Sequence, residues 1–329
     1  MARTLRKLLR HHGVLPPDHK GKGVRPVRIN GTEASFGAKI RGECEVEIGE
    51  DRYAVTAIPG RDRFTIEPLK PLPRHRIAGK TRVYCGYHKC LTMYTRRVFE
   101  STFGSRWNFG PSFRHFFHRS DEFERYHEQY ALSSISGHAL DLDRYDDIRV
   151  VRFVRDPRDL VVSGYYYHLR GAEKWSRVPD PVESEWRIVD GVVPAALQPR
   201  ESLASHLERV SLEDGLAAEF EFRRRHFDSM LAWPDSDPRV LLLRYEDTIG
   251  NEVETFRRIF DHFGFSWHLR RLGRRYADEY RASKRGGKDG HIRNASSGQW
   301  REHFTPALTE RFDREYGDVL DKLGYPRDS

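Results

Sequence analysis

Two segments of this 329-residue chain carry side chains that can bind phosphate groups. The first reads GYHKCLT and holds Lys89 and Thr92, and the second reads RDPRDLVVS and holds Arg155 and Ser163. Cations and hydroxyls bind anions well when they lie beside the unpaired backbone amides of a helix N-terminus. Two such turns in one sheet predict a ligand with two separated anionic groups.

Each segment has the pattern of a strand, a turn and a helix. A buried strand is predicted at 82–87 with a helix from about Thr92, and a second strand ends at Arg155, before the helix that follows Pro157. From about Thr81 onward strands alternate with helices, which is the pattern of a parallel α/β sheet with helices on both faces. Residues 239–245 (RVLLLRY) predict a third buried strand.

Three further helices are predicted from apolar spacing and end signals. The first runs from Ser211 to about Trp233, with inward residues Leu216, Phe220, Phe227 and Leu231. The second is predicted to have a capping box of Asn251 and Glu254 and to end at Gly264, with the apolar stripe Phe256, Ile259, Phe260 and Phe263. The third opens at Thr305 and Pro306 and ends at Gly324, and it buries Leu308, Phe312, Tyr316, Leu320 and Leu323.

The first 80 residues differ from the rest. After a basic start, the runs 43–48, 52–58 and 63–69 alternate apolar and polar residues and are separated by turn-forming residues. They predict a small antiparallel β unit, so we expect residues 1–80 to form a β-rich N-terminal unit of open role. Residues 81–329 are expected to form the main α/β domain.

Composition excludes several classes of protein. No apolar run approaches the ~20 residues of a membrane span, and the basic N-terminus lacks the apolar core of a signal peptide. Three cysteines are a sparse and odd set, which fits a reducing cytoplasm better than a disulfide framework. The formal charge of +8 favours anionic partners, but the charges interleave and no recognition motif accompanies them. Nucleic acid is therefore not an expected partner.

The first turn alone leaves its role open. It departs from the ATP-binding motif GxxxxGK[ST], because Cys90 follows Lys89 and no glycine stands next to the lysine. An ordinary strand-to-helix turn with a solvated lysine is one interpretation. An ATP-dependent kinase with a degenerate P-loop and a non-catalytic nucleotide-binding protein are two others.

Three motifs in order resemble those of the PAPS-dependent sulfotransferases of the cytosolic and bacterial type. HKCLTMY is similar to the family's PKSGTTW, the residues RDPRDLVVS match RxPxDxxxS, and RNASSGQW is similar to RKGxxGxW. The resemblance covers residues 81–325 and implies the P-loop-like α/β fold of that family. Leu91 and Met93 replace the usual glycine and second threonine of the first motif, and Asn294 and Ala295 replace lysine and glycine of the third.

The resemblance implies a role for each matching residue. Lys89 would stabilise the leaving phosphate during transfer. Thr92 would bind the 5′-phosphate of the nucleotide, and Tyr94 would stack on adenine or pack into the core. Arg155 and Ser163 would bind the 3′-phosphate. The remaining nucleotide-binding residues implied by the motifs are His88, Cys90, Arg293, Asn294 and Ala295.

Transfer also requires a general base for the acceptor proton. The family commonly has a histidine between the first two motifs, and SSISGHALDLD places His138 at that position, before the second strand. Histidine titrates near neutral pH, which suits this task. The alternative bases in the same interval are His115, His118, His127, Glu122 and Glu124.

The resemblance implies PAPS as the co-substrate, adenosine 3′,5′-bisphosphate as the product, and no metal. The acceptor is left open among small molecules, glycans and lipids. Residues 170–199, with Trp175 and Trp186, are expected to form loops over the acceptor site. A homodimer is possible, since the family's C-terminal dimer motif is partly echoed at residues 301–310.

Overall fold

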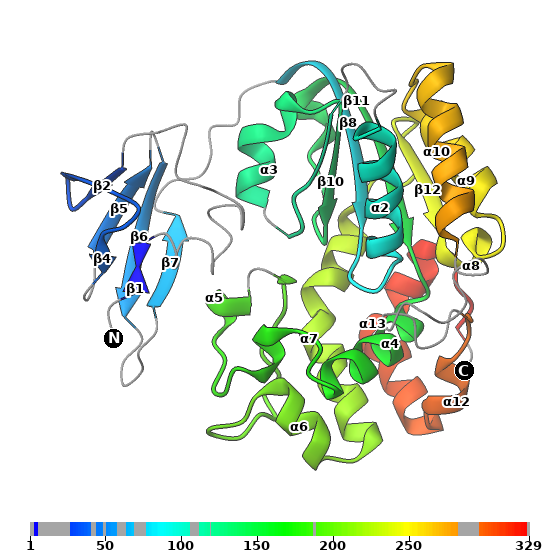
Figure 1. Ribbon diagram of the computed structural model, residues 1–329. Helices are drawn as coiled ribbons and strands as arrows, with labels where there is room; N and C mark the ends of the chain where they lie inside the picture. Colours follow the sequence, from blue (N-terminus) through cyan, green and yellow to red (C-terminus); the bar gives the residue numbers. More distant parts are fainter. Residues whose placement is uncertain are drawn as a thin grey trace.

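The structure is a computed structural model that describes residues 3–5, 27–40, 44–48, 51–57, 64–68, 77–105, 112–118, 120–186, 189–281 and 296–327. Figure 1 shows a small N-terminal sheet beside a larger α/β part. The larger part contains all the described residues that the sequence motifs single out. Arg293, Asn294 and Ala295 of the third motif lie outside the described residues.

The described strands of the larger part form one parallel sheet in the order β12-β11-β8-β10-β9. Their bounds are Ile77–Gly86 (β8), Phe113–His115 (β9), Leu132–Ser136 (β10), Tyr145–Val154 (β11) and Val240–Arg244 (β12). The parallel α/β prediction is thus confirmed. The chain runs from β8 toward β9 and β10, and then returns past β8 to β11 and β12. The end of β8 is therefore the topological switch point, where ligands of open α/β sheets bind.

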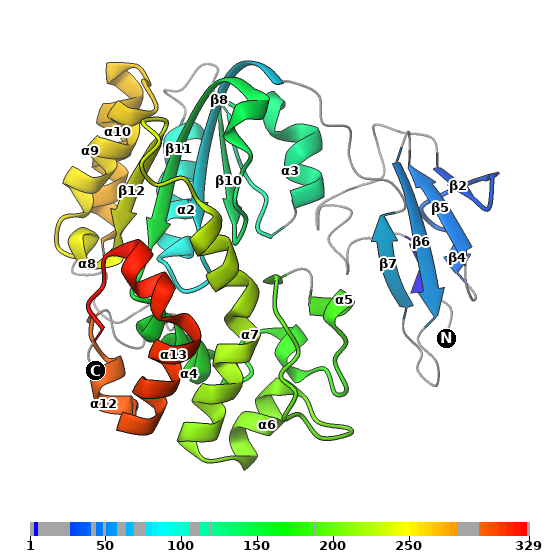
Figure 2. The same cartoon turned by 180° about the vertical axis from the view of Figure 1, so that it is seen from behind.

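Helices cover both faces of this sheet, as predicted, because alternate strand residues point to opposite sides. Tyr84 belongs to the larger apolar core, with the helices α2, α9 and α10. Its neighbours Val83 and Cys85 belong to a second core that includes Phe123 of α3 and Trp233. Figure 2 shows the same layers from behind, with α3 and α7 in view.

The helices of the larger part follow the strands closely. Their bounds are Thr92–Phe103 (α2), Ser120–Tyr126 (α3), Pro157–Leu169 (α4), Glu183–Trp186 (α5), Leu203–Arg209 (α6), Leu212–Ala232 (α7), Tyr245–Thr248 (α8), Glu252–His262 (α9), Trp267–Tyr280 (α10), Trp300–His303 (α12) and Pro306–Leu323 (α13). Short 3₁₀ turns are formed by His127–Gln129 (η1), Leu142–Arg144 (η2) and Lys174–Arg177 (η3). The predicted helices at 211–233, 251–264 and 305–324 correspond to α7, α9 and α13.

Two details of the helix predictions are wrong. Leu231 is 40% exposed, and Met230 is buried in its place, because steps of four residues drift around a helix of 3.6 residues per turn. Asn251 precedes α9 with φ −118° and ψ 22°, outside the extended conformation that a side-chain cap needs, and its side chain makes no capping bond. The Glu254 carboxylate accepts hydrogen bonds from Arg257 instead.

The N-terminal residues form an antiparallel sheet in the order β3-β2-β5-β6-β7, as the alternating runs predict. The bounds are Val27–Ile29 (β2), Thr32–Ala34 (β3), Cys44–Ile48 (β5), Asp51–Ala57 (β6) and Phe64–Pro68 (β7), with Arg3–Thr4 (β1) paired to Lys39–Ile40 (β4). Val46, Tyr53, Val55 and Ile66 form an apolar core of their own with Leu5 and Val27. Within the described ranges, no helix is long and apolar enough to cross a membrane.

Candidate functional site

The carboxyl ends of three neighbouring strands bring the predicted site residues to one edge of the sheet. Ser136 of β10 pairs with Gly86 of β8, and Arg152 of β11 pairs with Cys85 of β8, so the three strands end together. Lys89 follows β8, His138 follows β10 and Arg155 follows β11. The Arg155 charge contributes to lowering the pKa of Lys89, which reflects this proximity.

The first turn has an unusual backbone for residues other than glycine. Lys89 and Leu91 adopt φ of 72° and 54°, in the left-handed region. The Cys90 amide donates to the Tyr87 carbonyl oxygen at 3.0 Å, which closes the turn. Leu91 then stands at the N-cap of α2, where its apolar side chain cannot bond the first helical amides. This end of α2 therefore keeps amide donors for a ligand.

The Lys89 side chain lies over an aromatic ring in a crowded cationic environment. Its Nζ atom is 3.7 Å from the centroid of the Tyr167 ring on α4. Burial lowers the pKa of Lys89 to about 8, and the charges of Arg170 and Arg223 act in the same direction. A bound anion would offset this repulsion, so the position of Lys89 favours an anionic ligand.

The other residues of the first motif contact the protein itself. The Thr92 hydroxyl donates to the Tyr87 carbonyl oxygen at 3.2 Å, and the Cys90 side chain is fully buried. The Tyr94 hydroxyl donates to the Ala277 carbonyl oxygen at 2.9 Å, and its ring meets Phe256 edge-on. Tyr94 thus packs between α2, α9 and α10, while stacking on adenine stays a prediction.

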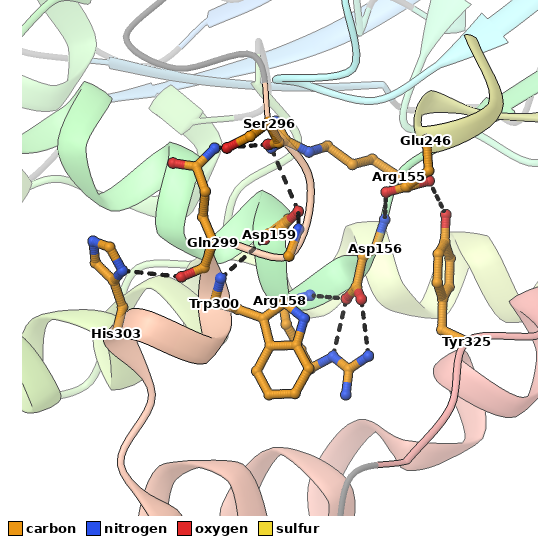
Figure 3. Close-up of polar contacts among 11 residues, drawn as sticks. Arg155, Asp156, Arg158, Asp159, Glu246, Ser296, Gln299, Trp300, His303 and Tyr325 are labelled. Atoms are coloured by element: carbon orange, nitrogen blue, oxygen red, sulfur yellow. Dashed lines mark hydrogen bonds and ion pairs between the residues drawn. The ribbon is translucent and has the colours of Figure 1, made fainter. Parts of the chain in front are cut away.

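The second turn is buried, and its charged residues pair within the protein (Figure 3). Arg155 follows β11, and its Nη2 donates to the Ser296 carbonyl oxygen at 3.3 Å and lies 3.6 Å from an Asp159 oxygen. The guanidinium lies 4.2 Å from the centroid of the Tyr245 ring. The Arg155 Nε is buried with no hydrogen-bond partner among the described residues, so one donor is left for a ligand.

Asp159 joins this turn to the end of the third motif. Its carboxylate accepts from the Gly298 amide at 2.7 Å and from the Trp300 amide at 3.0 Å (Figure 3). Burial raises the pKa of Asp159, although Arg155 and the two amide donors act in the opposite direction. The second and third motifs, distant in sequence, therefore meet at one carboxylate.

A second carboxylate fixes the start of α4. The Asp156 side chain accepts from the Arg158 amide at 2.9 Å and from the Arg158 guanidinium, whose Nη2 lies at 2.8 Å (Figure 3). The guanidinium also lies over the Trp300 ring, 3.8 Å from its centroid. Ser163, two turns along α4, is half-buried. The helix start is thus rigidly held beside Arg155.

His138 is positioned by a glycine turn. Gly137 adopts φ of 76°, a conformation that residues with a side chain rarely adopt. A Cβ atom there would also lie 2.9 Å from Nδ1 of His118, which is too close. The Gly137 amide donates to the Gly86 carbonyl oxygen at 3.1 Å, which ties His138 to the end of β8. The His138 Nε2 lies 2.9 Å from the His118 carbonyl oxygen. A carbonyl oxygen only accepts, so this nitrogen carries the proton and Nδ1 is left as the acceptor.

The alternative bases are distributed over both edges of the sheet. Glu124 pairs with Arg144, which precedes β11, and His127 lies 5.7 Å from the Tyr145 ring at the start of that strand, so both lie at the amino-end edge. His115 shares a 2.6 Å hydrogen bond with the Ser134 hydroxyl, beside a small cavity that Thr92 also lines. Burial holds the pKa of His118 well below its ordinary value. The Glu122 side chain lies outside the described residues.

A buried charge network beside the first turn was missed by sequence reasoning. Glu219 of α7 accepts from Arg223 Nε at 2.9 Å and pairs with His168 Nδ1 of α4 at 2.8 Å, and all three side chains are fully buried. The His168 ring is stacked on His88, with centroids 5.5 Å apart. Positions 219 and 223 lie on the same face of α7 as the inward residues Leu216, Phe220 and Phe227. This spacing in the sequence indicated that the two charged residues face inward.

Glu173 completes this group from the segment after α4. Its Oε2 accepts from the Trp175 indole nitrogen at 2.8 Å and lies 3.5 Å from His88 Nε2. Burial, together with the neighbouring His168 and Arg223, lowers the pKa of His88 well below its ordinary value.

Comparison with known proteins identifies the family of the chain. The family model described as "Sulfotransferase domain" matches residues 78–324, which is well over half of the chain. Rat (Rattus norvegicus) sulfotransferase 2A6 is 25% identical over 196 residues, which cover 54% of this chain. The match spans 58% of that rat protein, less than two thirds of its length.

Two solved structures resemble the chain at low sequence identity. A mouse sulfotransferase complexed with PAP has a TM-score of 0.42 at 17% identity, covering 76% of this chain and 84% of that one. A retinol dehydratase in complex with androsterone and inactive cofactor PAP has a TM-score of 0.40 at 17% identity, covering 84% and 90%.

Proposed function

Because the chain belongs to the sulfotransferase family, we propose that it transfers a sulfuryl group from PAPS to a hydroxyl or amine of an acceptor. One observation carries this proposal. The turn with Lys89 and the turn with Arg155 follow paired parallel strands, so two cationic sites lie at the same edge of the sheet, at its switch point. PAPS has two separate anionic ends, and two cationic turns at one edge of the sheet suit such a ligand.

The nucleotide would bind across these two turns. The amides at the start of α2 and the Thr92 hydroxyl would bind the 5′-phosphate, after Thr92 releases the Tyr87 carbonyl oxygen. Arg155, through its unpaired Nε, and Ser163 would bind the 3′-phosphate, together with Arg293, Asn294 and Ala295. The 3′-phosphate distinguishes PAPS from ATP, so Arg155 is the residue on which donor selectivity depends.

Lys89 would act on the leaving group. As the bond between sulfur and the phosphate oxygen breaks, negative charge develops on the phosphate, and a cation already in place stabilises that charge. The acceptor oxygen or nitrogen forms the new bond to sulfur from the opposite side, in line with the leaving oxygen. Adenosine 3′,5′-bisphosphate then leaves as the product. The transfer step needs no metal ion.

His138 would take the proton that the acceptor loses. Its protonated Nε2 is bound to the His118 carbonyl oxygen, so the free lone pair is on Nδ1. That nitrogen accepts the acceptor proton as the bond to sulfur forms. Glu124 and His127 are unsuited to this step, because both lie at the amino-end edge of the sheet.

The acceptor class is a wider proposal. We place it among small molecules, glycans and lipids, because aromatic side chains gather beside the Lys89 turn. Trp175 stacks on Phe222 with ring centroids 5.3 Å apart. Trp175 also contacts Trp186 and His168. We further propose that the protein is located in the cytoplasm and forms a homodimer. We do not propose nucleic acid as a partner. We assign the chemistry to residues 81–329 and treat residues 1–80 as a separate unit with its own apolar core.

The test is thermal stability with adenosine 3′,5′-bisphosphate, with ATP and AMP as controls. A ligand that binds only the folded state stabilises it by about 2.7 kcal/mol at a hundredfold excess over Kd. We expect stabilisation by the bisphosphate alone, and loss of that effect in Arg155→Ala. Equal stabilisation by ATP would instead favour a kinase, and no response to any nucleotide would contradict the proposal.

A further inference from the structure

Three metal-binding side chains converge beside the first turn, and the family resemblance assigns none of them to a metal. We propose that His88, His168 and Glu173 bind a zinc ion. Glu173 Oε2 lies 3.5 Å from His88 Nε2 and 3.9 Å from His168 Nε2, and the three ligand atoms all lie within 4.8 Å of one another. This site is additional to the transfer step, which uses Lys89 and no metal.

The distances suit a shared ion better than direct hydrogen bonds. A hydrogen bond between these atoms would be roughly 2.7–3.0 Å long. Ligand atoms at ~2.0–2.2 Å from a tetrahedral zinc ion lie roughly 3.4 Å apart. The two distances to Glu173 are 3.5 and 3.9 Å, close to this separation, and the two histidine nitrogens lie within 4.8 Å of each other. Two imidazoles and one carboxylate form a common donor set for zinc, with one coordination position left over.

Partners outside the ligand set hold two of the three ligands in position. The Glu219 carboxylate bonds His168 Nδ1 at 2.8 Å, so the proton is on Nδ1 and the lone pair of Nε2 points toward Glu173. The indole N–H of Trp175 donates to the same Glu173 oxygen that faces both histidines, and leaves its second lone pair for an ion. A carboxylate that orients a ligating histidine is the usual partner arrangement of metal sites.

The unpaired nitrogen of His168 is a second, independent observation. His168 is fully buried, and its Nε2 has no hydrogen-bond partner among the described residues. A buried polar atom without a partner costs ~1–3 kcal/mol, so it usually marks a missing ligand or water. An ion at this position would satisfy that nitrogen. It would also place its charge beside the Glu173 carboxylate.

A zinc ion here would connect three segments of the chain. His88 lies in the first turn, His168 near the end of α4, and Glu173 before η3. The Glu173 segment begins the region expected to cover the acceptor. We infer that the ion fixes this segment against Lys89 and thereby shapes the acceptor side of the site.

The experiment measures metal in tag-free, full-length protein purified without chelator. We expect about one zinc ion per chain by elemental analysis. Zinc affinity, measured by competition with a chromogenic chelator, should fall at least tenfold in His88→Ala and in Glu173→Gln, because loss of even an orienting partner costs ~10–100-fold. Cobalt added to the metal-free protein should give visible absorption bands that both variants lack.

His127→Gln is the matched control. His127 is buried and also has an unpaired ring nitrogen, but it lies at the other edge of the sheet. This variant should keep the wild-type zinc affinity. Circular dichroism in the presence of chelator would show that all variants fold alike. Iron in place of zinc, absence of bound metal, or unchanged affinity in both ligand variants would overturn the proposal. These measurements use no nucleotide, so they stand or fall separately from sulfuryl transfer.

Discussion

Asp159→Asn tests the junction between the second turn and residues 296–300. Aspartate accepts from the Gly298 and Trp300 amides with separate oxygens, at 2.7 and 3.0 Å. Asparagine keeps one oxygen and turns an N–H group toward the other amide. One hydrogen bond is lost and a buried backbone amide is left facing a second donor, which should destabilise the fold by about 1–3 kcal/mol.

The charge itself should contribute little to this loss. Burial raises the pKa of Asp159 in the folded protein, so ionisation is less favourable there than in the unfolded chain. The stability from such a group is greatest at low pH and is lost as the pH rises through the folded-state pKa. At neutral pH a neutral asparagine therefore avoids a cost of ionisation. The expected destabilisation comes from hydrogen-bond geometry alone.

The same substitution should weaken nucleotide binding. Residues 296–300 directly follow Arg293, Asn294 and Ala295, which we propose as part of the 3′-phosphate site. If the whole 1–3 kcal/mol is lost from this docked segment, the Kd for adenosine 3′,5′-bisphosphate rises by roughly 5–150-fold. Urea unfolding at pH 7 and calorimetric titration would measure the two effects on one preparation.

Asp156→Asn is the matched control for this experiment. Asp156 is a buried carboxylate of the same turn, but it bonds Arg158 rather than residues 296–300. Asparagine caps a helix as well as aspartate does, so this variant keeps the bond to the Arg158 amide and loses one acceptor for the Arg158 guanidinium. It should destabilise the fold by about 1–3 kcal/mol, with a much smaller change in Kd. Equal weakening of nucleotide binding by both variants, or no change in Asp159→Asn, would refute the reasoning.

Three further predictions concern the proposed transfer reaction. Lys89→Ala should lower kcat by about 100-fold or more while the Kd for the bisphosphate changes little, and an active variant would remove the leaving-group role. Arg155→Ala should raise the Kd for the bisphosphate by about 10-fold or more and leave AMP binding unchanged, because only the 3′-phosphate loses a partner. Unchanged bisphosphate affinity would move that subsite elsewhere. His138→Gln should lower kcat by ~100-fold or more at constant donor affinity, and a full rate would transfer the base role to His115 or His118.

Local patterns were enough to predict the turns and the strands before them. A strand, a cation-bearing turn and a helix are contiguous in sequence, so GYHKCLT and RDPRDLVVS could be placed at strand ends without knowledge of the fold. Their arrival at one edge then follows from parallel pairing. The pairing of Asp159 with residues 298 and 300 could not be predicted, because its partners lie about 140 residues away and are backbone amides that any sequence offers.

Side-chain environment was the part that the sequence predicted least well. Glu219 and Arg223 look like an ordinary surface ion pair one helical turn apart, and only packing of α7 against α4 buries them with His168. Asn251 has the residue type of a cap, but the backbone before α9 does not adopt the extended conformation that capping needs. Both cases depend on tertiary packing, because spacing along α7 indicates which positions face inward but not which partners meet the charges there.

The left-handed conformation of Leu91 has a consequence for tracing distant relatives of this chain. The first motif of the sulfotransferases usually has glycine at this position, the residue best suited to a positive φ. Here a leucine occupies the position with φ 54°, at a cost of about 1–2 kcal/mol. The first motif of this chain therefore departs from the family's spelling at a residue whose backbone conformation glycine would favour. A search pattern that insists on glycine at this position would miss this chain, whereas a search by backbone conformation would find it.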